Sequence, residues 1–336
     1  MVSSVEARKP RVEVESVNQV AVVVEDAGKA MEFCWNAFGI GPWDIYTFEP
    51  PFVSYYEYRG RPAQARAKVA LARVGEVQLE FIEHLSGETI YRDFLTEHGG
   101  GLHHLQFLVD DANQGKEILA EEGHVCIQWA HFGDTGVYAY MDMKPLHSIW
   151  ELVQLPEYRG VMPDHYPENP RPRIPSIKIT GIDKVAMVVK DVQKTVESYW
   201  AIFGIGPWEI YLHKAPLVRD FAYHGKPSQG GAKVARCRVG ALQLELIEPL
   251  YGDTIYHDHL SRHGEGLHHL SFFVEDLDES VKILAREGFP CLQSACLGDR
   301  GSYAYMDIKP LHTICELARP ASDRDMEAIL YPPESS

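Results

Sequence analysis

The sequence has no long apolar run. Its longest uninterrupted apolar stretches, residues 20–24 and 185–189, are far shorter than the roughly 20 residues that a membrane-spanning helix needs. The first residues also lack the apolar centre of a secretory signal peptide, because Glu6, Arg8 and Lys9 are scattered among them. We therefore expect a cytoplasmic protein without a membrane partner.

Basic residues are scarce as well. Lys and Arg total 32 against 48 Asp and Glu, which gives a formal net charge of -16. A surface of this sign repels a phosphate backbone, so nucleic acid is excluded as a partner and a small molecule remains. The six cysteines form no CxxC pair, and in a chain of this size the pattern predicts reduced thiols.

What the sequence does contain is an internal repeat. The chain has 336 residues, of which 45% are hydrophobic, enough for two domains of ordinary size. The segment FGIGPW begins at Phe38 and again at Phe203, and GLHHL begins at Gly101 and again at Gly266, each time 165 residues later. YAYMD and KPLH recur at the same offset. A repeat with one constant offset predicts two domains of the same fold.

The repeat and the proline content set the expected boundaries. Residues 155–176 contain six prolines, which exclude a helix interior or a central strand there. We expect an N-terminal tail over 1–14, a first domain over 15–154, a linker over 155–178, a second domain over 179–320 and a C-terminal tail over 321–336.

Each repeat contains the same order of elements twice. In the first repeat, QVAVVVED predicts a strand, AGKAMEFCWNAF a helix, and KVALARV with VQLEFIEH a hairpin. LHHLQFLVDD then predicts a strand, NQGKEILAEEG a helix, and GVYAYMD and SIWELVQ two further strands. Both halves of the repeat therefore fit a β-α-β-β-β unit.

These motifs and this element order resemble the vicinal oxygen chelate superfamily, which includes glyoxalase I, methylmalonyl-CoA epimerase, bleomycin-resistance proteins and extradiol dioxygenases. The resemblance implies an α+β fold of tandem domains. In each domain two βαβββ units would form an open, cupped mixed sheet with its helices outside. It also implies one divalent metal ion (Zn, Ni, Co, Mn or Fe(II)) on the inner face of the cup.

The resemblance carries the family's ligands onto four residues of the first domain: Gln19, Glu80, His104 and Glu151. Each lies within an apolar strand, where a carboxylate costs several kcal/mol unless it is paired or bound to a cation. Strand alternation places Gln19 on one face with Ala21, and Glu80 on one face with Ile82 (VQLEFIE). Ligands of this kind leave positions open for substrate, so a catalytic metal is expected.

The second domain departs from this pattern at one position. Its equivalent residues are Lys184, Glu245, His269 and Glu316. A protonated lysine has no acceptor and cannot ligate a cation, so we expect a metal-free site in which Lys184 neutralises the two carboxylates. Two alternatives are a three-ligand metal site without Lys184, and a deprotonated Lys184 that serves as a base.

The resemblance also implies a reaction class. Glu80 and Glu151 would act as base and conjugate acid, and His147, four residues before Glu151, is a candidate for a second acid or base. We expect an isomerase, epimerase or lyase that abstracts a proton next to a carbonyl of a small oxygenated, possibly aromatic, substrate. FGIGPW favours the epimerase-like branch over glyoxalase I itself.

Three alternatives to this reaction class remain open. They are a ligand-sequestering protein like the bleomycin-resistance relatives, a metal-dependent hydrolase and, less favoured, an extradiol dioxygenase, whose iron takes two histidines and one carboxylate. Residues that we expect around the substrate are Trp43, Tyr46, Tyr55, Tyr56, His84 and His131. The fused pair of domains predicts either a monomeric pseudo-dimer or a homodimer of the whole chain.

Overall fold

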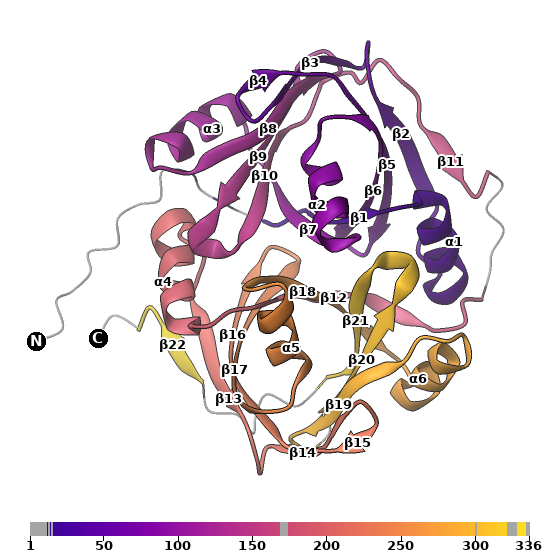
Figure 1. Cartoon of the computed structure of the whole chain (residues 1–336), viewed down its shortest axis with the longest axis vertical. Helices are drawn as coiled ribbons and strands as arrows, with labels where there is room; N and C mark the ends of the chain where they lie inside the picture. The colour runs from indigo at the N-terminus through magenta and orange to yellow at the C-terminus, as the bar shows by residue number, and fades with distance from the viewer. Residues whose placement is uncertain are drawn as a thin grey trace, which may run out of the picture.

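The computed structural model describes residues 12, 14, 16–168, 174–299, 301–320 and 328–333. Figure 1 shows two halves of similar shape, the first running from indigo to magenta and the second from salmon to yellow. Each half contains one 11-stranded sheet, and the two sheets have matching strand orders. The repeat in the sequence is therefore a repeat in structure.

The first half contains the following elements. They are β1 (Gln19–Val24), α1 (Ala27–Phe38), β2 (Trp43–Phe48), β3 (Val53–Tyr58), β4 (Arg61–Pro62), β5 (Ala65–Val74), β6 (Val77–Gly87), α2 (Ile90–His98), β7 (Gly101–Leu108), α3 (Ala112–Glu121), β8 (Val125–Phe132), β9 (Gly136–Met143), η1 (Lys144–Leu146), β10 (Ser148–Gln154) and β11 (Asp164–Tyr166).

The second half follows the same order. Its elements are β12 (Ile179–Val188), α4 (Val192–Phe203), β13 (Trp208–His213), β14 (Val218–Tyr223), β15 (Lys226–Pro227), β16 (Gly230–Val239), β17 (Leu242–Gly252), α5 (Ile255–Arg262), β18 (Gly266–Val274), α6 (Leu277–Arg286), β19 (Cys291–Leu297), β20 (Gly301–Ile308), η2 (Lys309–Leu311), β21 (Thr313–Arg319) and β22 (Ile329–Tyr331).

The strand order of the first sheet is β11-β2-β5-β6-β1-β7-β10-β9-β8-β3-β4. Strand β1 pairs in parallel with β6 and antiparallel with β7, so the two βαβββ units meet at the centre of a mixed sheet. The short strands β3 and β4 leave the first unit and join β8 at the far edge of the second. Both the α+β class and the tandem cupped sheets predicted from the sequence are confirmed.

Residues of the central strands alternate between two apolar environments. In β1, Val20 and Val22 pack into the large core beneath the helices, whereas Ala21 and Val23 belong to a second cluster inside the cup. In β6, Phe81 faces that large core, and its neighbours face the cup. This alternation is the period of two expected of a sheet with both faces covered, and it directs the polar residues of β1 and β6 into the cup.

The two halves share one core. Phe38 at the end of α1 stacks on Phe272 of β18 with ring centres 5.3 Å apart, and Phe203 of α4 lies 5.4 Å from Phe107 of β7. Trp150 of β10, fully buried, also contacts Phe203. Each half therefore places its first helix against the sheet of the other, which buries large aromatic surface at the junction.

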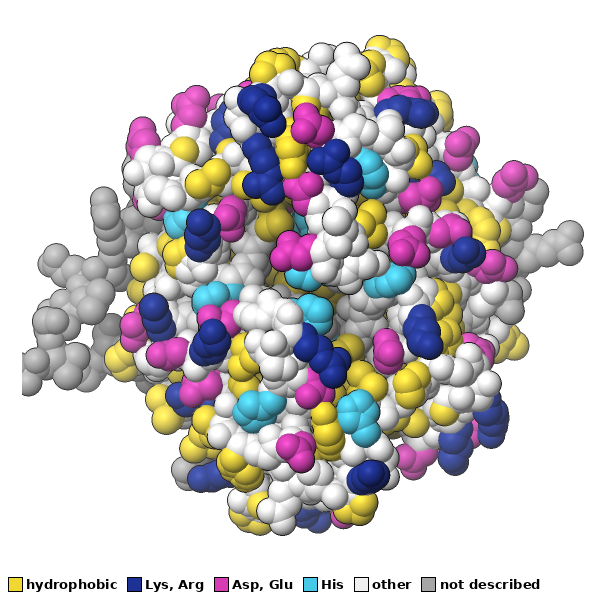
Figure 2. Space-filling model, viewed as in Figure 1, with side chains coloured by type: hydrophobic (Ala, Val, Ile, Leu, Met, Phe, Trp, Pro, Cys, Tyr) yellow, Lys and Arg dark blue, Asp and Glu magenta, His cyan; other side chains and the backbone are white. Residues whose placement is uncertain are grey.

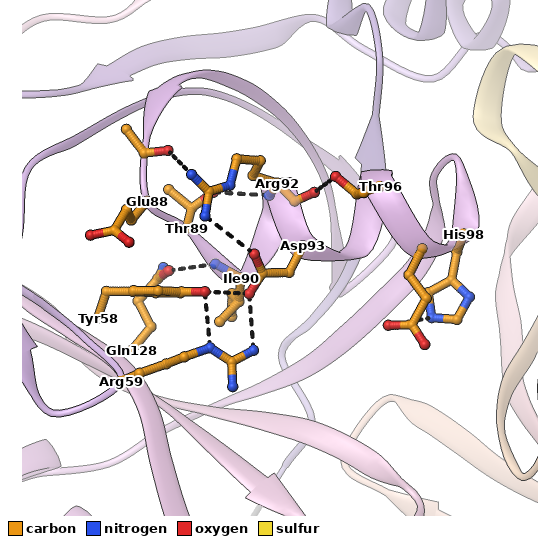
Figure 3. Close-up of polar contacts among 12 residues, drawn as sticks. Tyr58, Arg59, Glu88, Thr89, Ile90, Arg92, Asp93, Thr96, His98 and Gln128 are labelled. Carbon is orange, nitrogen blue, oxygen red and sulfur yellow. Dashed lines mark hydrogen bonds and ion pairs between the residues drawn. The ribbon is translucent and has the colours of Figure 1, made fainter.

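Helices α2 and α5 lie near the middle of the molecule, each within the curve of its own sheet (Figure 1). Helix α2 begins at an N-cap, Thr89, whose side chain accepts a hydrogen bond from the backbone of Arg92. Figure 3 shows that Asp93 of α2 is held by the hydroxyl of Tyr58 and by the guanidinium of Arg59, both from the region of β3. These contacts fix α2 over the cup.

Two expectations from composition bear on the whole chain. The six cysteines are free thiols, as their spacing predicts. No helix in the described ranges is long and apolar enough to cross a membrane.

Candidate metal centre in the first half

Three neighbouring strands of the first cup place three donor residues together. Glu80 comes from β6, His104 from β7 and Glu151 from β10, and one donor atom of each lies within 4.8 Å of the other two. Nε2 of His104 is 3.4 Å from Oε2 of Glu80 and 3.4 Å from Oε2 of Glu151. All three side chains are buried. The residues are distant in sequence and converge because β1 joins the two βαβββ units.

The ring of His104 is oriented by its neighbour in sequence. Nδ1 of His104 lies 2.9 Å from Nδ1 of His103, so one of these nitrogens carries a proton and the other accepts it. Burial holds the pKa of His103 well below its ordinary value, with the charge of His104 adding to the effect. His103 is thus neutral, and this contact directs Nε2 of His104 toward the carboxylates.

Two glutamines complete the floor of the cup. Nε2 of Gln106 donates to Oε1 of Gln19 at 2.9 Å and to Oε2 of Glu151 at 3.2 Å. Gln19 therefore lies beside the three donors, as the family pattern implied. Gln106 was missed in the sequence analysis, although it lies two residues after His104 and so shares its face of β7.

The charges of this site are unbalanced without a bound cation. Burial raises the pKa of Glu80, an effect to which Glu151 adds and which His104 opposes. Burial also opposes the charge of His104, but the two carboxylates outweigh it and raise its pKa to about 9. Two buried acidic groups thus share one ionisable imidazole, and their only ion-pair partner among the described residues is His104.

Several polar atoms at this position have no partner. Within the described part of the chain, Nε2 of Gln19, Oε2 of Glu80 and Nε2 of His104 are buried without a hydrogen bond. An unpaired buried polar atom costs on the order of 1–3 kcal/mol, so three at one point indicate a missing ligand. Carboxylate, imidazole and amide oxygen donors suit a divalent cation. The residues present fit a metal ion.

A cavity of about 180 Å³ opens from these donors into the cup. Aromatic side chains form much of its wall: Phe48, Tyr56, Tyr91, Phe132, Tyr138 and Tyr140. Burial, with the charges of Glu80 and Glu151, raises the pKa of Tyr138 and of Tyr140, so both remain neutral phenols. The lining predicted from the sequence is right for Tyr56 and missed the other five aromatics.

The remaining residues expected around the substrate lie elsewhere. Trp43 is fully buried on the opposite face of the sheet, where it stacks on Phe81 at 4.6 Å, because its strand position directs it toward α1. Tyr55 is exposed and contacts Trp129 and His131 on the outside of β3 and β8. These three predicted residues therefore fall outside the cavity.

Tyr46 and His84 are also outside the cavity wall. Tyr46 packs on Phe52, and the guanidinium of Arg159 lies over its ring. Nδ1 of His84 is 3.0 Å from the hydroxyl oxygen of Thr89, the N-cap of α2. Both have structural contacts, and the sequence contains no signal that separates them from lining residues.

His147 does not share a strand face with Glu151. It follows the short helix η1 as its C-cap with φ 53°, and β10 begins only at the next residue. This left-handed turn directs the imidazole away from the cup, to a position 3.5 Å from Glu265 of the other half. The even spacing failed as a guide because it assumed that the strand extends back to residue 147.

The second cup holds the equivalent triad together with cations of its own. Glu245, His269 and Glu316 again lie within 4.8 Å of one another. Nζ of Lys184 lies 2.8 Å from Glu316, and Nε of Arg236 lies 2.7 Å from Glu245. The carboxylates that lack a cation in the first half are therefore paired in the second.

Arg236 was not identified from the sequence. It lies directly opposite Glu245 in the hairpin of β16 and β17, whereas the first half has Leu71 opposite Glu80. The register of the predicted hairpin contained this signal. Lys184 also contacts Asp183 at 3.0 Å, so three carboxylates and two cations share this interior.

The charge state of Lys184 follows from these contacts. Burial opposes its charge, but Glu316, Glu245 and Asp183 outweigh burial and raise its pKa above the ordinary value. The pKa of Glu316 is lowered, since Lys184 and His269 overcome its burial. Lys184 is therefore a permanent ammonium in this environment, which argues against the alternative in which it acts as a base.

Comparisons with known proteins agree with this geometry. The family profile described as "Glyoxalase/Bleomycin resistance protein/Dioxygenase superfamily" matches residues 18–140 and again residues 183–305. An uncharacterized protein of Bacillus subtilis (strain 168), YqjC, is 31% identical over 149 residues, which is 44% of this chain and 96% of that protein.

Two solved structures resemble the whole chain. One is a mutant of 4-hydroxymandelate synthase from Streptomyces coelicolor, with 17% identity, a TM-score of 0.59, and coverage of 94% of this chain and 96% of the other. The second is a fusion of a xylose isomerase-like TIM barrel with 4-hydroxyphenylpyruvate dioxygenase, with 12% identity, a TM-score of 0.53, and coverage of 94% and 51%. Since the family profile covers both repeats, the chain belongs to the glyoxalase/bleomycin resistance protein/dioxygenase superfamily.

Proposed function

We propose that the first half of the chain is a metal-dependent enzyme of the isomerase, epimerase or lyase type, which removes a proton next to a carbonyl group of a small substrate. One observation carries the proposal. Two buried carboxylates, Glu80 and Glu151, face His104 with no basic side chain paired to them in the described structure. This arrangement is costly unless a cation or a transferred proton compensates it.

Gln19, Glu80, His104 and Glu151 would hold the metal ion, which would stabilise negative charge that develops on substrate oxygens. The proton-transfer roles belong to the two glutamates. Glu80 is suited to hold a proton because burial raises its pKa, and general bases with raised pKa values work close to neutral pH. Glu151 keeps its orientation through the hydrogen bond from Gln106.

The cavity supports an apolar or aromatic substrate body. Its wall is largely aromatic, and its polar groups lie at the floor beside Glu80 and Glu151. The hydroxyl of Tyr91 donates to that of Tyr140 at 2.7 Å, and the ring of Tyr140 lies 4.8 Å from that of His104. Neutral phenols at this position can donate to a substrate oxygen and keep water from the reacting carbon.

A ligand-sequestering protein is the second candidate. The observation that favours it is the second cup, which has a cavity of about 230 Å³ although Lys184 and Arg236 occupy the space beside its carboxylates. A cup that contains its own cations can bind a ligand without a metal. The proposed enzyme needs only the first cup.

The proposal is tested by metal analysis and hydrogen exchange. Protein purified without an affinity tag is analysed for its metal content, then incubated in D₂O with aromatic and aliphatic ketones, aldehydes and oxo acids. Mass spectrometry detects exchange of the hydrogen next to the carbonyl. The metal-loaded protein should accelerate exchange for at least one compound, and Glu80→Gln should reduce that rate by about 10²- to 10⁴-fold.

The matched control is Glu76→Gln, an exposed glutamate at the turn of the same hairpin, which should leave both metal content and exchange unchanged. A protein that acquires no metal on reconstitution, or an exchange rate that Glu80→Gln does not alter, would contradict the proposal and leave the ligand-sequestering function.

A further inference from the structure

A second group of potential metal-binding side chains lies outside both cups. A cleft of about 510 Å³ separates the two halves, bordered by α2 of the first half and α5 of the second. Figure 2 shows histidine side chains gathered around this hollow at the centre of the face in view. Seven histidines line the cleft: His98, His103, His147, His259, His263, His268 and His312.

Three of these histidines come from the facing helices. His98 ends α2, His259 lies in α5, and His263 caps the C-terminal end of α5. His98 and His263 are equivalent positions of the two repeats, 165 residues apart, so they meet across the junction of the halves. His259 has Phe94 as its equivalent, and the cluster is therefore a property of this junction and is not repeated on each side.

The spacing of the rings suits a shared cation. His259 and His263 are four residues apart, a separation that places two side chains on one helix face, as in zinc-binding helices. Their ring centres are 5.3 Å apart, and those of His98 and His263 are 5.8 Å apart. Two imidazoles bound to one tetrahedral zinc, at Zn–N distances of about 2.1 Å, have ring centres about 5 Å apart.

The surroundings favour a cation. The charged residues that line the cleft are one arginine, Arg59, and five acidic residues: Asp93, Glu97, Asp142, Glu265 and Asp307. Arg59 is paired with Asp93 at 2.9 Å, so its charge is already balanced. The carboxylate of Glu97 lies 3.8 Å from Nε2 of His98, within reach as a further oxygen ligand.

The histidines are also in the protonation state that ligands require. Burial lowers the pKa of His259 to about 4, and the charges of His263, His269 and His98 add to this effect. The pKa of His263 is lowered in the same direction by its burial and by His98. Neutral imidazole is the form that binds a metal.

We propose that His98, His259 and His263 form an interdomain site for a divalent cation of the zinc, nickel or copper class. In the described structure, only the two strand triads already hold three His, Cys, Asp or Glu donor atoms within 4.8 Å. The three cleft rings converge by rotation about their side-chain bonds, which the exposure of His263 and the partial exposure of His98 permit. A bound cation joins the first half to the second.

Zinc stoichiometry tests this site separately from the metal centre of the first cup. Tag-free protein is stripped with a chelator and dialysed against increasing Zn²⁺, and bound zinc is measured by mass spectrometry. Wild type should bind two equivalents. His263→Ala should weaken one of them about tenfold or more, since even changes around metal ligands cost 10- to 100-fold, and should leave the other. Glu80→Gln should do the reverse.

The matched control is His165→Ala, because His165 lies far from the cleft on β11, where it contacts Asp44. It should retain both equivalents. Loss of binding in His165→Ala equal to that in His263→Ala, or unchanged binding in His263→Ala, overturns the cleft site. If Glu80→Gln has no effect while His263→Ala loses one equivalent, the cleft site stands and the proposed function fails.

A second measurement does not depend on the folding of one variant. In Glu80→Gln protein, added Cu²⁺ should give an electron paramagnetic resonance spectrum with splitting from at least two nitrogens, and His98→Ala should reduce that number. The His98 change lies in the other half from His263, so both halves are tested. A spectrum without nitrogen splitting overturns the site.

Discussion

The same substitution at equivalent positions of the two cups should have opposite effects on stability. Glu80 and Glu245 occupy matching positions on β6 and β17 and are both buried. The folded protein raises the pKa of Glu80 and lowers that of Glu245. Folding therefore disfavours the charged form of the first carboxylate and favours that of the second, so replacing the charge by a neutral amide changes stability with opposite sign.

The magnitudes follow from the partners. Glu245 lies 2.7 Å from Arg236, which is itself largely buried. Removing one member of such a pair costs about 3–5 kcal/mol because the other charge is left uncompensated. At about 2–4 °C per kcal/mol for domains of this size, the melting temperature of Glu245→Gln should fall by roughly 10 °C. Glu80→Gln relieves repulsion with Glu151 and should stabilise the metal-free protein by up to about 1 kcal/mol.

The assay is differential scanning calorimetry of both variants at pH 7.5 in the presence of a chelator, followed by the same scans with Zn²⁺. Zinc should raise the melting temperature of wild type and Glu245→Gln by more than that of Glu80→Gln, because only the latter loses a ligand of the first cup. Equal destabilisation by the two substitutions in chelator, or a Glu245→Gln protein as stable as wild type, would refute the charge assignment of the two cups.

Three further predictions concern the same residues and the shared core. The double variant Lys184→Gln/Arg236→Leu introduces the first-half residue types into the second cup and should add one equivalent of bound zinc, whereas the wild-type second cup binds none; metal analysis of the tag-free proteins decides this. His104 has a pKa of about 9 in the metal-free fold, above its ordinary value, so it is protonated at pH 7.5 and its stabilising charge is lost as pH rises through 9. Zinc binding to the first cup should therefore release about one proton at pH 7.5 and strengthen as pH rises toward 9, and calorimetry in two buffers of different ionisation enthalpy would show no difference if this were wrong. Trp150→Ala removes a fully buried ring that contacts Tyr199 and Phe203 of the other half, so it should cost about 3–5 kcal/mol in urea unfolding; a loss below 1 kcal/mol would argue against a shared core.

The sequence by itself determined the features that depend on local pattern and on repetition. The offset of 165 residues gave two domains of one fold, and the alternation in β1 and β6 directed Gln19 and Glu80 into the cup. These predictions succeeded because a strand has a period of two and each face must be buried or exposed as a unit. The family pattern then brought His104 and Glu151 to the same place.

Only the tertiary structure decided which charges meet. Arg236 is distant from Lys184 and Glu316 in sequence, yet all three share one interior because the hairpin of β16 and β17 lies two strands from β18. His147 was misplaced because a single left-handed residue ends the strand pattern at that point. Such contacts depend on strand register and chain reversal, which local periodicity does not record.

The junction between the halves was likewise beyond sequence patterns. Trp43 and Tyr55 belong to one aromatic-rich segment, but alternation within twisted, bent strands directs one into the core and the other to the surface. His98 and His263 meet across the junction only because the two repeats pack together. A repeat predicts that two domains have the same fold, whereas the surface on which they join is set by the packing of particular side chains in three dimensions.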